Sequence, residues 1–463
     1  MSDFESYQSP FSWRYGSQAM RAIWSEHNKR LFWRSLWVSL AEVQTRWNLV
    51  TLEQLEDLKR HASQVDLPKS FEVESSLKHD LMAEIKVFAA QCPVGGGVIH
   101  LGATSMDIKD NAEALQIRQS IEVLAEKLKS LLLALASLIE RTASMTVMAF
   151  THLQPAEPTT LGYRFANFAQ DLLEDYEALI DFKKNLRGKG FKGAVGNAAS
   201  YIELFGEDGF EDFERQISEL IDLPFFPVTT QTYPRRQDYI LLSRLAGLAA
   251  TLSKFAFDLR VLQSQPIGEL SEPFGQNQVG SSAMPFKRNP IDAEKIDSLA
   301  RTVSVAPQIA WHNAANSLLE RTLDDSANRR TLLPESFLAL DEMVITTFRI
   351  ISGIVINQQA IDKTKNTYAP FAGIERLLMV LVKKGADRQK MHELLREHSL
   401  AAWQEMADGK PNPLVTSLTS DPILLSFLSQ EEILHAMDSD QYVGIAQKRA
   451  LSIAHQITRL FDK

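Results

Sequence analysis

Apolar residues follow a helical repeat along the stretches of this chain that lack proline and glycine. Residues 112–154 contain neither, and seven apolar positions from Ile117 to Leu138 recur at intervals of three and four. That spacing places them on one face of a helix. A helix of about 30 residues would run roughly 45 Å, which is longer than the usual helix of a globular domain. The pattern therefore predicts one very long helix.

Two further segments predict long helices, and prolines mark where other helices begin. Residues 163–187 lack proline and glycine, and residues 235–265 are bounded by proline on both sides. Pro290 and Pro334 are each expected in the first turn of a helix, and Pro307 is expected to kink the helix that begins at Pro290. Because no alternating strand pattern separates these segments, we predict an all-α fold around a bundle of long helices.

The two ends of the chain differ from this middle. Residues 1–104 predict shorter helices broken by the loop Cys92–Gly97, and residues 357–463 predict short helices separated by glycine and proline. We therefore expect three domains, 1–104, 105–356 and 357–463, with the long helices in the central one.

Composition narrows the class of protein. The formal charge of −9 over 463 residues argues against a protein that coats nucleic acid. Cys92 is the one cysteine, so no intrachain disulfide can form, which fits a reducing cytoplasm. The N-terminus lacks a basic stretch followed by an apolar run, and no apolar stretch approaches the ~18 residues that span a bilayer. We expect a cytoplasmic protein that binds neither membrane nor nucleic acid.

Two motifs with well-known chemistry fit poorly. Gly188–Gly193 has the glycine spacing of a dinucleotide-binding turn, but it follows a helical segment rather than a strand, so a glycine-rich turn that ends a helix is favoured. His392-Glu393 begins like a zinc-protease helix, but Arg396 stands at the second ligand position. We expect no metal and no redox nucleotide.

The strongest chemical signal is the segment Gly280–Pro290, which reads GSSAMPFKRNP. Its glycine permits movement, its serines offer hydroxyls, and Lys287 and Asn289 offer a cation and an amide that suit a carboxylate. Pro290 then opens a helix whose N-terminus favours negative charge. On composition alone, an ordinary polar connection between helices explains the segment equally well.

That segment closely resembles the signature of the fumarase/aspartase superfamily, whose members cleave C–N or C–O bonds and release fumarate. His100–Ser105 and Thr151–Ala156 resemble the superfamily's first and second conserved blocks, in the expected order. The resemblance covers most of the chain. It implies a three-domain helical fold that assembles into a homotetramer, in which each active site draws its blocks from three chains.

Three more segments resemble the adenylosuccinate lyase family within that superfamily: Ser12–Tyr15, Lys78–Asp80 and Glu320–Arg330. The last carries arginines and a hydroxyl at helical spacing, which suits a phosphate monoester. The chain departs from the family at Gly193–Asn197, which resembles another branch, and at Lys295, where some members carry arginine.

The resemblance implies that fumarate is eliminated from adenylosuccinate, giving AMP, and from the succinyl-carboxamide ribotide of purine synthesis, giving the carboxamide ribotide. By position, Ser281 would be the general base and His152 the general acid, with Glu294 orienting that histidine. Lys287 and the start of the helix that follows would stabilise the serine alkoxide or the dianionic intermediate. His79 would assist at the other side of the substrate.

The substrate contacts implied by the resemblance fall into three groups. The succinyl carboxylates would be held by Thr104, Ser105 and Asn289. The phosphate and ribose would be held by Arg14, Tyr15, Arg321, Ser326 and Arg330. Further contacts would come from Lys78, Asp80, Thr151, Gln231 and Lys295. No cofactor is implied.

Three other functions are weighed against this one. Argininosuccinate lyase and 3-carboxymuconate cycloisomerase are relatives whose substrates lack a phosphate, which would leave Arg14, Ser326 and Arg330 without a purpose. A helical scaffold without catalysis would leave Ser281, His152 and Lys287 without a shared one.

Overall fold

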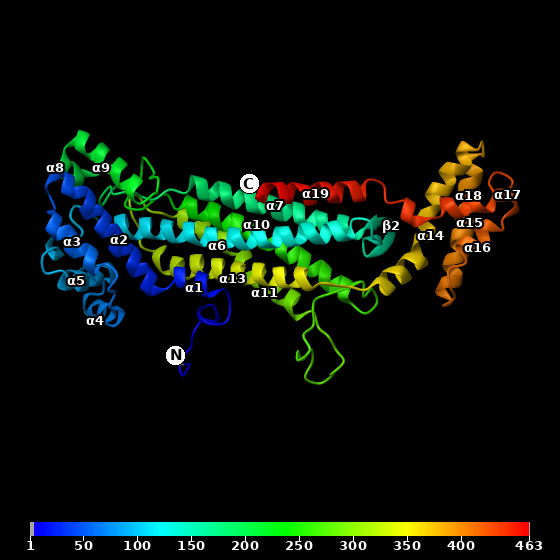
Figure 1. Cartoon of the computed structure of the whole chain (residues 1–463), viewed down its shortest axis with the longest axis horizontal. Helices are drawn as coiled ribbons and strands as arrows, with labels where there is room; N and C mark the ends of the chain where they lie inside the picture. Colours follow the sequence, from blue (N-terminus) through cyan, green and yellow to red (C-terminus); the bar gives the residue numbers. More distant parts are fainter. Residues whose placement is uncertain (1–3, 463) are drawn as a thin grey trace. The chain divides into compact units, whose positions relative to one another are not determined.

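The computed structural model describes residues 4–462 and is built mostly of helices (Figure 1). The chain forms two compact units. Unit 1 comprises residues 4–128, 175–250 and 298–345, and unit 2 comprises residues 129–174, 251–297 and 346–462. The division runs through five helices, which are α6 (Ser105–Thr142), α7 (Leu161–Asn185), α10 (Arg236–Gln263), α11 (Ile291–Ser304) and α13 (Ser326–Gly353).

The remaining elements belong to one unit each. Those of unit 1 are η1 (Pro10–Ser12), α1 (Gln18–Ile23), α2 (Glu26–Gln44), η2 (Thr45–Trp47), α3 (Leu52–His61), α4 (Leu67–Leu77), α5 (Asp80–Gln91), η3 (Gly96–Val98), α8 (Ala199–Phe205), α9 (Glu207–Leu220) and α12 (Ala306–Ala315). Those of unit 2 are β1 (Thr146–Thr151), β2 (Gln154–Thr160), β3 (Leu270–Ser271), β4 (Val355–Ile356), α14 (Gln358–Lys383), α15 (Arg388–Ala407), α16 (Leu414–Thr419), α17 (Pro422–Leu425), α18 (Gln430–Ala436), η4 (Ser439–Gln441) and α19 (Ala446–Phe461).

The predicted very long helix is confirmed as α6, drawn in cyan in Figure 1. All seven apolar positions from Ile117 to Leu138 are at most 1% exposed, so the three-and-four spacing marked the buried face. The helix ends at Thr142, and an antiparallel hairpin of β1 and β2 follows it. The sequence pattern did not indicate this hairpin, because a short hairpin needs no long alternating run.

Two expectations about proline were also wrong. Pro334 lies inside α13, in its third turn, rather than in the first turn of a helix. Pro307 does not kink a continuous helix, since α11 ends at Ser304 and Pro307 lies in the first turn of α12. A missing N–H is tolerated at the start of a helix, so the chain breaks the helix there instead of bending it.

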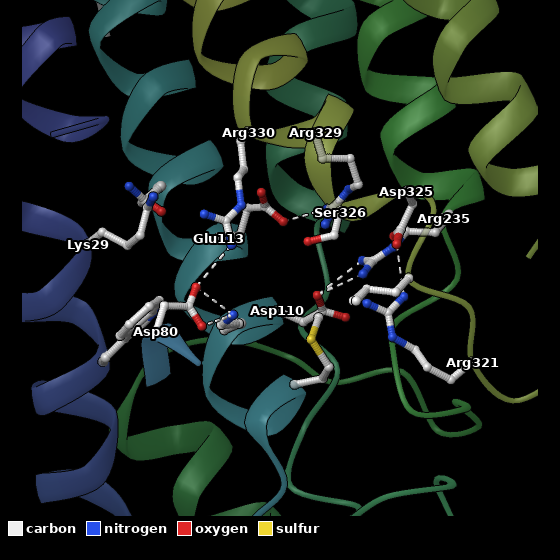
Figure 2. A pocket seen from close by; sticks show the side chains of 15 residues that line it. Lys29, Asp80, Asp110, Glu113, Arg235, Arg321, Asp325, Ser326, Arg329 and Arg330 are labelled. Carbon is white, nitrogen blue, oxygen red and sulfur yellow. Dashed lines mark hydrogen bonds and ion pairs between the residues drawn. The ribbon is translucent and has the colours of Figure 1, made fainter. Parts of the chain in front are cut away.

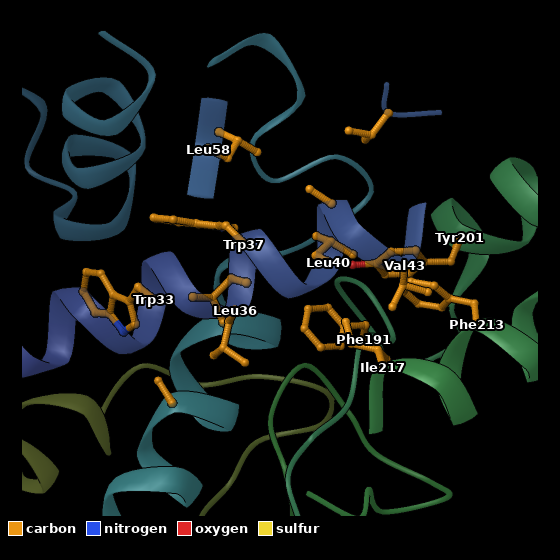
Figure 3. Packing of buried hydrophobic residues seen from close by; sticks show 14 of the residues in the cluster. Trp33, Leu36, Trp37, Leu40, Val43, Leu58, Phe191, Tyr201, Phe213 and Ile217 are labelled. Carbon is orange, nitrogen blue, oxygen red and sulfur yellow. The ribbon is translucent and has the colours of Figure 1, made fainter. Parts of the chain in front are cut away.

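The core of unit 1 is rich in aromatic residues (Figure 3). Trp37 and Phe88 stack with ring centroids 6.2 Å apart, and Tyr201 stacks on Phe213 at 5.1 Å. Phe191, in the segment after α7, meets Phe213 edge to face at 6.3 Å. Such contacts add to the burial of large apolar rings. They fix the segments around the polar cavity described below.

Helix α10 is long and apolar enough, by length and composition, to cross a membrane. Its apolar character has a simpler cause, since its leucines form part of the core: Leu241, Leu242, Leu245, Leu248 and Leu252 are each 0% exposed. A single helix of this kind is ordinary in the centre of a helix bundle.

Candidate active site

A polar cavity in unit 1 is lined by residues from α2, α5, α6, α13 and the segments that precede α10 and α13 (Figure 2). Its lining includes four of the predicted site residues, which are Asp80, Arg321, Ser326 and Arg330. Cations outnumber anions among the lining side chains by two, because six lysines and arginines face four carboxylates. That excess suits an anionic ligand.

On one side of the cavity, Asp80 joins two cations. Its Oδ1 accepts from Lys109 Nζ at 2.6 Å, and its Oδ2 accepts from Arg330 Nη2 at 3.1 Å. Burial alone would raise the pKa of this carboxyl, but Lys109 and Arg330 outweigh burial and hold the pKa at about 2. Asp80 is therefore ionised throughout the physiological range and orients both cations.

The other side is organised by a second carboxylate, Asp325. Its Oδ1 accepts from Arg321 Nη1 at 2.9 Å, and its Oδ2 accepts from Arg235 Nε at 2.7 Å. Arg235 also donates from Nη1 and Nη2 to Asp110 Oδ1, each at 3.1 Å. Burial opposes ionisation of Asp325, yet Arg235 and Arg321 hold its pKa below the usual value.

Arg329, in the wall of the cavity, ties α13 to α6 and α10. Its Nε donates to Asp238 Oδ2 at 2.8 Å, its Nη2 donates to the Tyr233 hydroxyl at 2.7 Å, and it forms an ion pair with Glu113. Burial lowers the pKa of this guanidinium, but Asp238 and Glu113 overcome that effect and raise it. The side chain is 6% exposed, so its partners are shielded from water.

Thr104 and Ser105 lie at the N-terminus of α6, and their backbone is held by buried Asp107. Asp107 Oδ2 accepts from the amides of Thr104 at 2.9 Å and Gly193 at 3.2 Å, while Lys189 forms an ion pair with Oδ1. The glycine-rich turn thus encloses a carboxylate of its own chain. As predicted, the turn follows the end of a helix, since α7 ends at Asn185.

His79 and Lys78 lie just before α5. His79 caps that helix, because its Nδ1 accepts from the amide of Met82 at 3.2 Å. The proton of the neutral ring must then sit on Nε2, which is available to donate. Lys78 adopts a left-handed backbone with φ of 55° and ends α4.

Gln231 is joined to the cavity segment, whereas Arg14 and Tyr15 are not. The amide of Gln231 donates to the carbonyl of Glu320, next to Arg321, at 3.1 Å. Arg14 and Tyr15 follow η1 and do not line the cavity; the guanidinium of Arg14 lies 5.7 Å from the ring of Trp13.

The predicted base, Ser281, lies in unit 2 on the long loop between α10 and α11. Its Oγ accepts from two backbone amides, Ala283 at 3.3 Å and Met284 at 3.1 Å. Amide donors aimed at one oxygen favour its ionised form. Lys287 is exposed nearby in the same loop.

The base of this loop is closed tightly. Asn289 Nδ2 donates to the carbonyl of Gly280 at 2.9 Å, and a Cβ added at Gly280 would lie 2.0 Å from the carbonyl oxygen of Lys287. Only glycine permits that approach. The loop is therefore pinned at residues 280 and 289, while the stretch between them is exposed.

The first amides of α11 already have a ligand. Buried Glu272 accepts from the amides of Asp292 at 3.2 Å and Ala293 at 3.1 Å. Burial raises the pKa of this carboxyl against the pull of those two amides. Because Glu272 occupies these amides, the start of α11 is not free to stabilise the alkoxide or the intermediate as expected. Lys287 and the loop amides remain as candidates for that role.

His152 forms the tip of the β1–β2 hairpin. Thr151 pairs with Gln154, which leaves His152 and Leu153 as a two-residue turn with φ of 52° and 60°. Such a turn usually needs glycine or asparagine, and non-glycine residues held there often mark functional positions. The imidazole is exposed.

Glu294 lies in the first turn of α11, and Lys295 follows it. Glu294 is exposed, and Lys295 Nζ lies 3.7 Å from Asp292 Oδ1. Among the described residues of one chain, no hydrogen bond or ion pair joins His152 to Glu294 or to Ser281. One chain thus gathers part of the anion-binding group but not the proton-transfer group.

Sequence reasoning missed the charged residues that support the cavity, namely Lys109, Asp110, Glu113, Arg235 and Arg329. A signal was present, since Lys109, Asp110 and Glu113 lie close together on a helix whose other faces are largely apolar. Buried charges of this kind must find partners.

A group of possible metal ligands lies elsewhere in unit 1. Asp57, His61 and Cys92 offer ligand atoms within 4.8 Å of one another. Asp57 Oδ2 already accepts from the amides of Val94 and Gly95, each at 2.8 Å, and burial raises the pKa of the Cys92 thiol to about 11. These features describe a carboxylate that anchors a loop beside a protonated thiol.

Comparisons with known proteins cover nearly the whole chain. Residues 39–304 match a family model described as lyase, and residues 371–450 match one described as adenylosuccinate lyase C-terminus. The adenylosuccinate lyase of Saccharomyces cerevisiae is 35% identical over 458 residues, covering 97% of this chain and 94% of the relative. That of Schistosoma mansoni is 38% identical over 430 residues, covering 91% and 89%.

Solved structures share the fold. A 3-carboxy-cis,cis-muconate lactonizing enzyme from Pseudomonas putida superposes with a TM-score of 0.85 at 22% identity, covering 98% of this chain and 100% of that one. A fumarate lyase from Mesorhizobium sp. BNC1 superposes with a TM-score of 0.84 at 20% identity, covering 97% and 99%. At this identity the likeness establishes the fold alone, and it confirms the predicted fumarase/aspartase-like architecture.

Proposed function

This chain belongs to the adenylosuccinate lyase family of carbon–nitrogen lyases, and we propose that it eliminates fumarate from adenylosuccinate and from the succinyl-carboxamide ribotide of purine synthesis. The observation that carries the proposal is the cationic cavity around Arg321, Ser326 and Arg330 (Figure 2). Guanidinium groups bind a phosphate monoester in a bidentate manner, and a serine hydroxyl completes such a site. Argininosuccinate and carboxymuconate offer no phosphate to this cavity.

In the proposed reaction, Ser281 removes a proton beside a carboxylate and His152 protonates the departing nitrogen. A neutral serine is a weak base. The two amides that donate to Ser281 Oγ lower the cost of its alkoxide, and Lys287 adds a positive charge from the same loop. Thr104, Ser105 and Asn289 would hold the succinyl carboxylates.

His152 and His79 suit proton transfer for different reasons. His152 projects from a fixed turn and is exposed, so it can reach a substrate held by other segments. His79 is locked by its helix cap with Nε2 as the donor. Glu294 would orient His152 from a neighbouring subunit.

We also propose a cytoplasmic homotetramer whose sites are shared between subunits. Support comes from the lack, among the described residues of one chain, of a hydrogen bond or ion pair joining His152 to Ser281 or Glu294, and from exposed apolar side chains on the long helices, such as Phe257 on α10 and Phe348 on α13. Neighbouring chains would cover these surfaces and complete the sites.

One assay tests the activity. Purified protein should release fumarate from adenylosuccinate, measured by absorbance, and EDTA should leave the rate unchanged because the proposed steps use only side chains and backbone amides. The same cavity should make the enzyme inactive on the substrate that lacks the 5′-phosphate. Activity on argininosuccinate instead would contradict the proposal.

Mixing two inactive variants tests the shared sites. Ser281→Ala and His152→Ala subunits should regain activity when they exchange, because roughly a quarter of sites would then combine an intact serine with an intact histidine. Size-exclusion chromatography with light scattering would verify oligomer size, and a different affinity tag on each variant would verify exchange. Background activity after proven exchange would show that one chain supplies both groups.

A further inference from the structure

We propose that Asp325 is a positioning residue that holds Arg321 ready for the substrate phosphate, and that buried Arg235 keeps Asp325 in place. The inference rests on the proposed function, because it concerns how the anion cavity achieves its selectivity. It assigns a task to two nearly buried side chains of the cavity wall, which act through Arg321.

The geometry shows a carboxylate shared between two arginines (Figure 2). One oxygen of Asp325 accepts from Arg321 at 2.9 Å, and the other accepts from Arg235 at 2.7 Å. Asp325 is 2% exposed and Arg235 is 4% exposed, so water competes little for either group. A buried carboxylate with both oxygens committed has one orientation, and it passes that orientation to Arg321.

Arg235 is fixed from its far side by Asp110. Three of its donors are committed to Asp325 and Asp110, and its guanidinium carbon lies 4.7 Å from the centre of the Tyr233 ring. Asp110 in turn accepts from the amide of Tyr233 at 2.8 Å. The series of contacts from Asp110 through Arg235 and Asp325 to Arg321 therefore links α6 to the segments before α10 and α13, and each member is held by its neighbours.

The charges of these four linked side chains exclude a purely electrostatic role in attracting the phosphate. The two carboxylates of Asp110 and Asp325 balance the guanidinium groups of Arg235 and Arg321. Together the four side chains therefore contribute no net charge to the cavity. Asp325 also lies beside the arginine that would bind the phosphate, where its charge opposes an anion. A carboxylate in that place makes sense if it spares Arg321 the entropy of ordering a long side chain when the ligand binds.

This reasoning separates position from charge. Asp325→Asn removes a negative charge from the cavity, so electrostatics alone would strengthen the binding of a phosphate. If position dominates, the same substitution weakens phosphate binding, because Arg321 loses its charged partner. A purely structural role would change stability and leave the preference for phosphate as it was.

The experiment compares AMP with adenosine as ligands of the wild-type protein and of Asp325→Asn by calorimetry. We expect the preference for AMP over adenosine to fall on the order of tenfold in the variant, the scale of one charge-assisted hydrogen bond. Adenosine binding itself should stay within about twofold of wild type. A preference that rises or stays unchanged would overturn the inference.

Asp324→Asn is the matched control. Asp324 precedes Asp325, carries the same charge, is exposed, and accepts from the Thr322 hydroxyl at 2.8 Å. Its substitution should leave the preference for AMP unchanged. Equal losses in the two variants would show that the loss does not depend on the contact between Asp325 and Arg321, and would also overturn the inference.

Arg235→Lys provides a second route if Asp325→Asn folds poorly. Lysine keeps the positive charge but cannot donate to Asp325 and Asp110 in the forked geometry of arginine. The preference for AMP should again fall, with thermal unfolding recorded beside it to verify the fold. A wild-type protein without any preference for AMP would contradict the proposed function itself, which distinguishes that failure from a failure of the positioning role.

Discussion

The cavity of unit 1 and the Gly280–Asn289 loop of unit 2, which are proposed to bind and to transform the substrate, are built in opposite ways. The cavity arginines are held by carboxylates: Asp80 joins Arg330 to partly buried Lys109, and Asp325 joins Arg321 to buried Arg235. The loop is pinned at its two ends and exposed between them, with Ser281 held by its own backbone amides. Binding thus relies on tertiary packing, whereas the proposed chemistry relies on a short local turn.

This difference predicts that damage to the loop lowers activity without lowering stability. Ser281→Ala should reduce kcat by at least ~10²-fold, the scale of a positioned general base, with an unchanged melting temperature. The control is Ser282→Ala, the exposed neighbouring hydroxyl, which should retain nearly normal turnover. Comparable losses in both variants, measured as fumarate release, would remove Ser281 from its role.

Damage to the buried wall of the cavity should instead lower stability. Arg329→Met leaves Asp238 and Glu113 without their buried cation, and such losses cost about 3–5 kcal/mol of unfolding free energy. Arg330→Met, at the adjacent exposed arginine, should cost under ~1 kcal/mol while weakening AMP binding. Urea unfolding measures the stability of both variants. Equal unfolding free energies for Arg329→Met and Arg330→Met would contradict the prediction.

A change at the start of α11, which follows the loop, should lower both stability and activity, each by an intermediate amount. Glu272→Gln keeps the shape of the side chain but removes the charge that two amides of α11 share. We expect a loss of about 1–2 kcal/mol in stability and a several-fold drop in kcat, because the loop loses a fixed end. Unchanged turnover in a destabilised variant would show that the anchor serves the fold alone.

Unit 1 should also show a pH dependence of its stability. Burial lowers the pKa of His100 to about 4, below its usual 6.5, and its Nδ1 accepts from Trp37 Nε1 at 3.0 Å. Between those values the unfolded chain binds a proton that the folded ring refuses, so stability falls as the pH drops from 6.5 to 4. His100→Gln, which keeps an acceptor, should lose less stability across this window in urea titrations. An identical pH dependence would contradict this assignment.

The sequence alone determined the long helices and the family. The seven apolar positions of α6 predicted its buried face because helical spacing is a local property of the chain. The segment Gly280–Pro290 identified the superfamily because its parts are contiguous. The adenylosuccinate lyase comparisons later agreed with that resemblance.

Only the tertiary structure decided which distant charges meet. Asp110, Arg235 and Asp325 are separated by 90 residues or more along the chain, and no local spacing announces their contact. Whether the first amides of α11 stay open to a substrate was equally undecided until Glu272 was seen to occupy them. The physical reason is the same in both cases: a buried charge takes whatever partner the packing brings near, and packing depends on the whole chain.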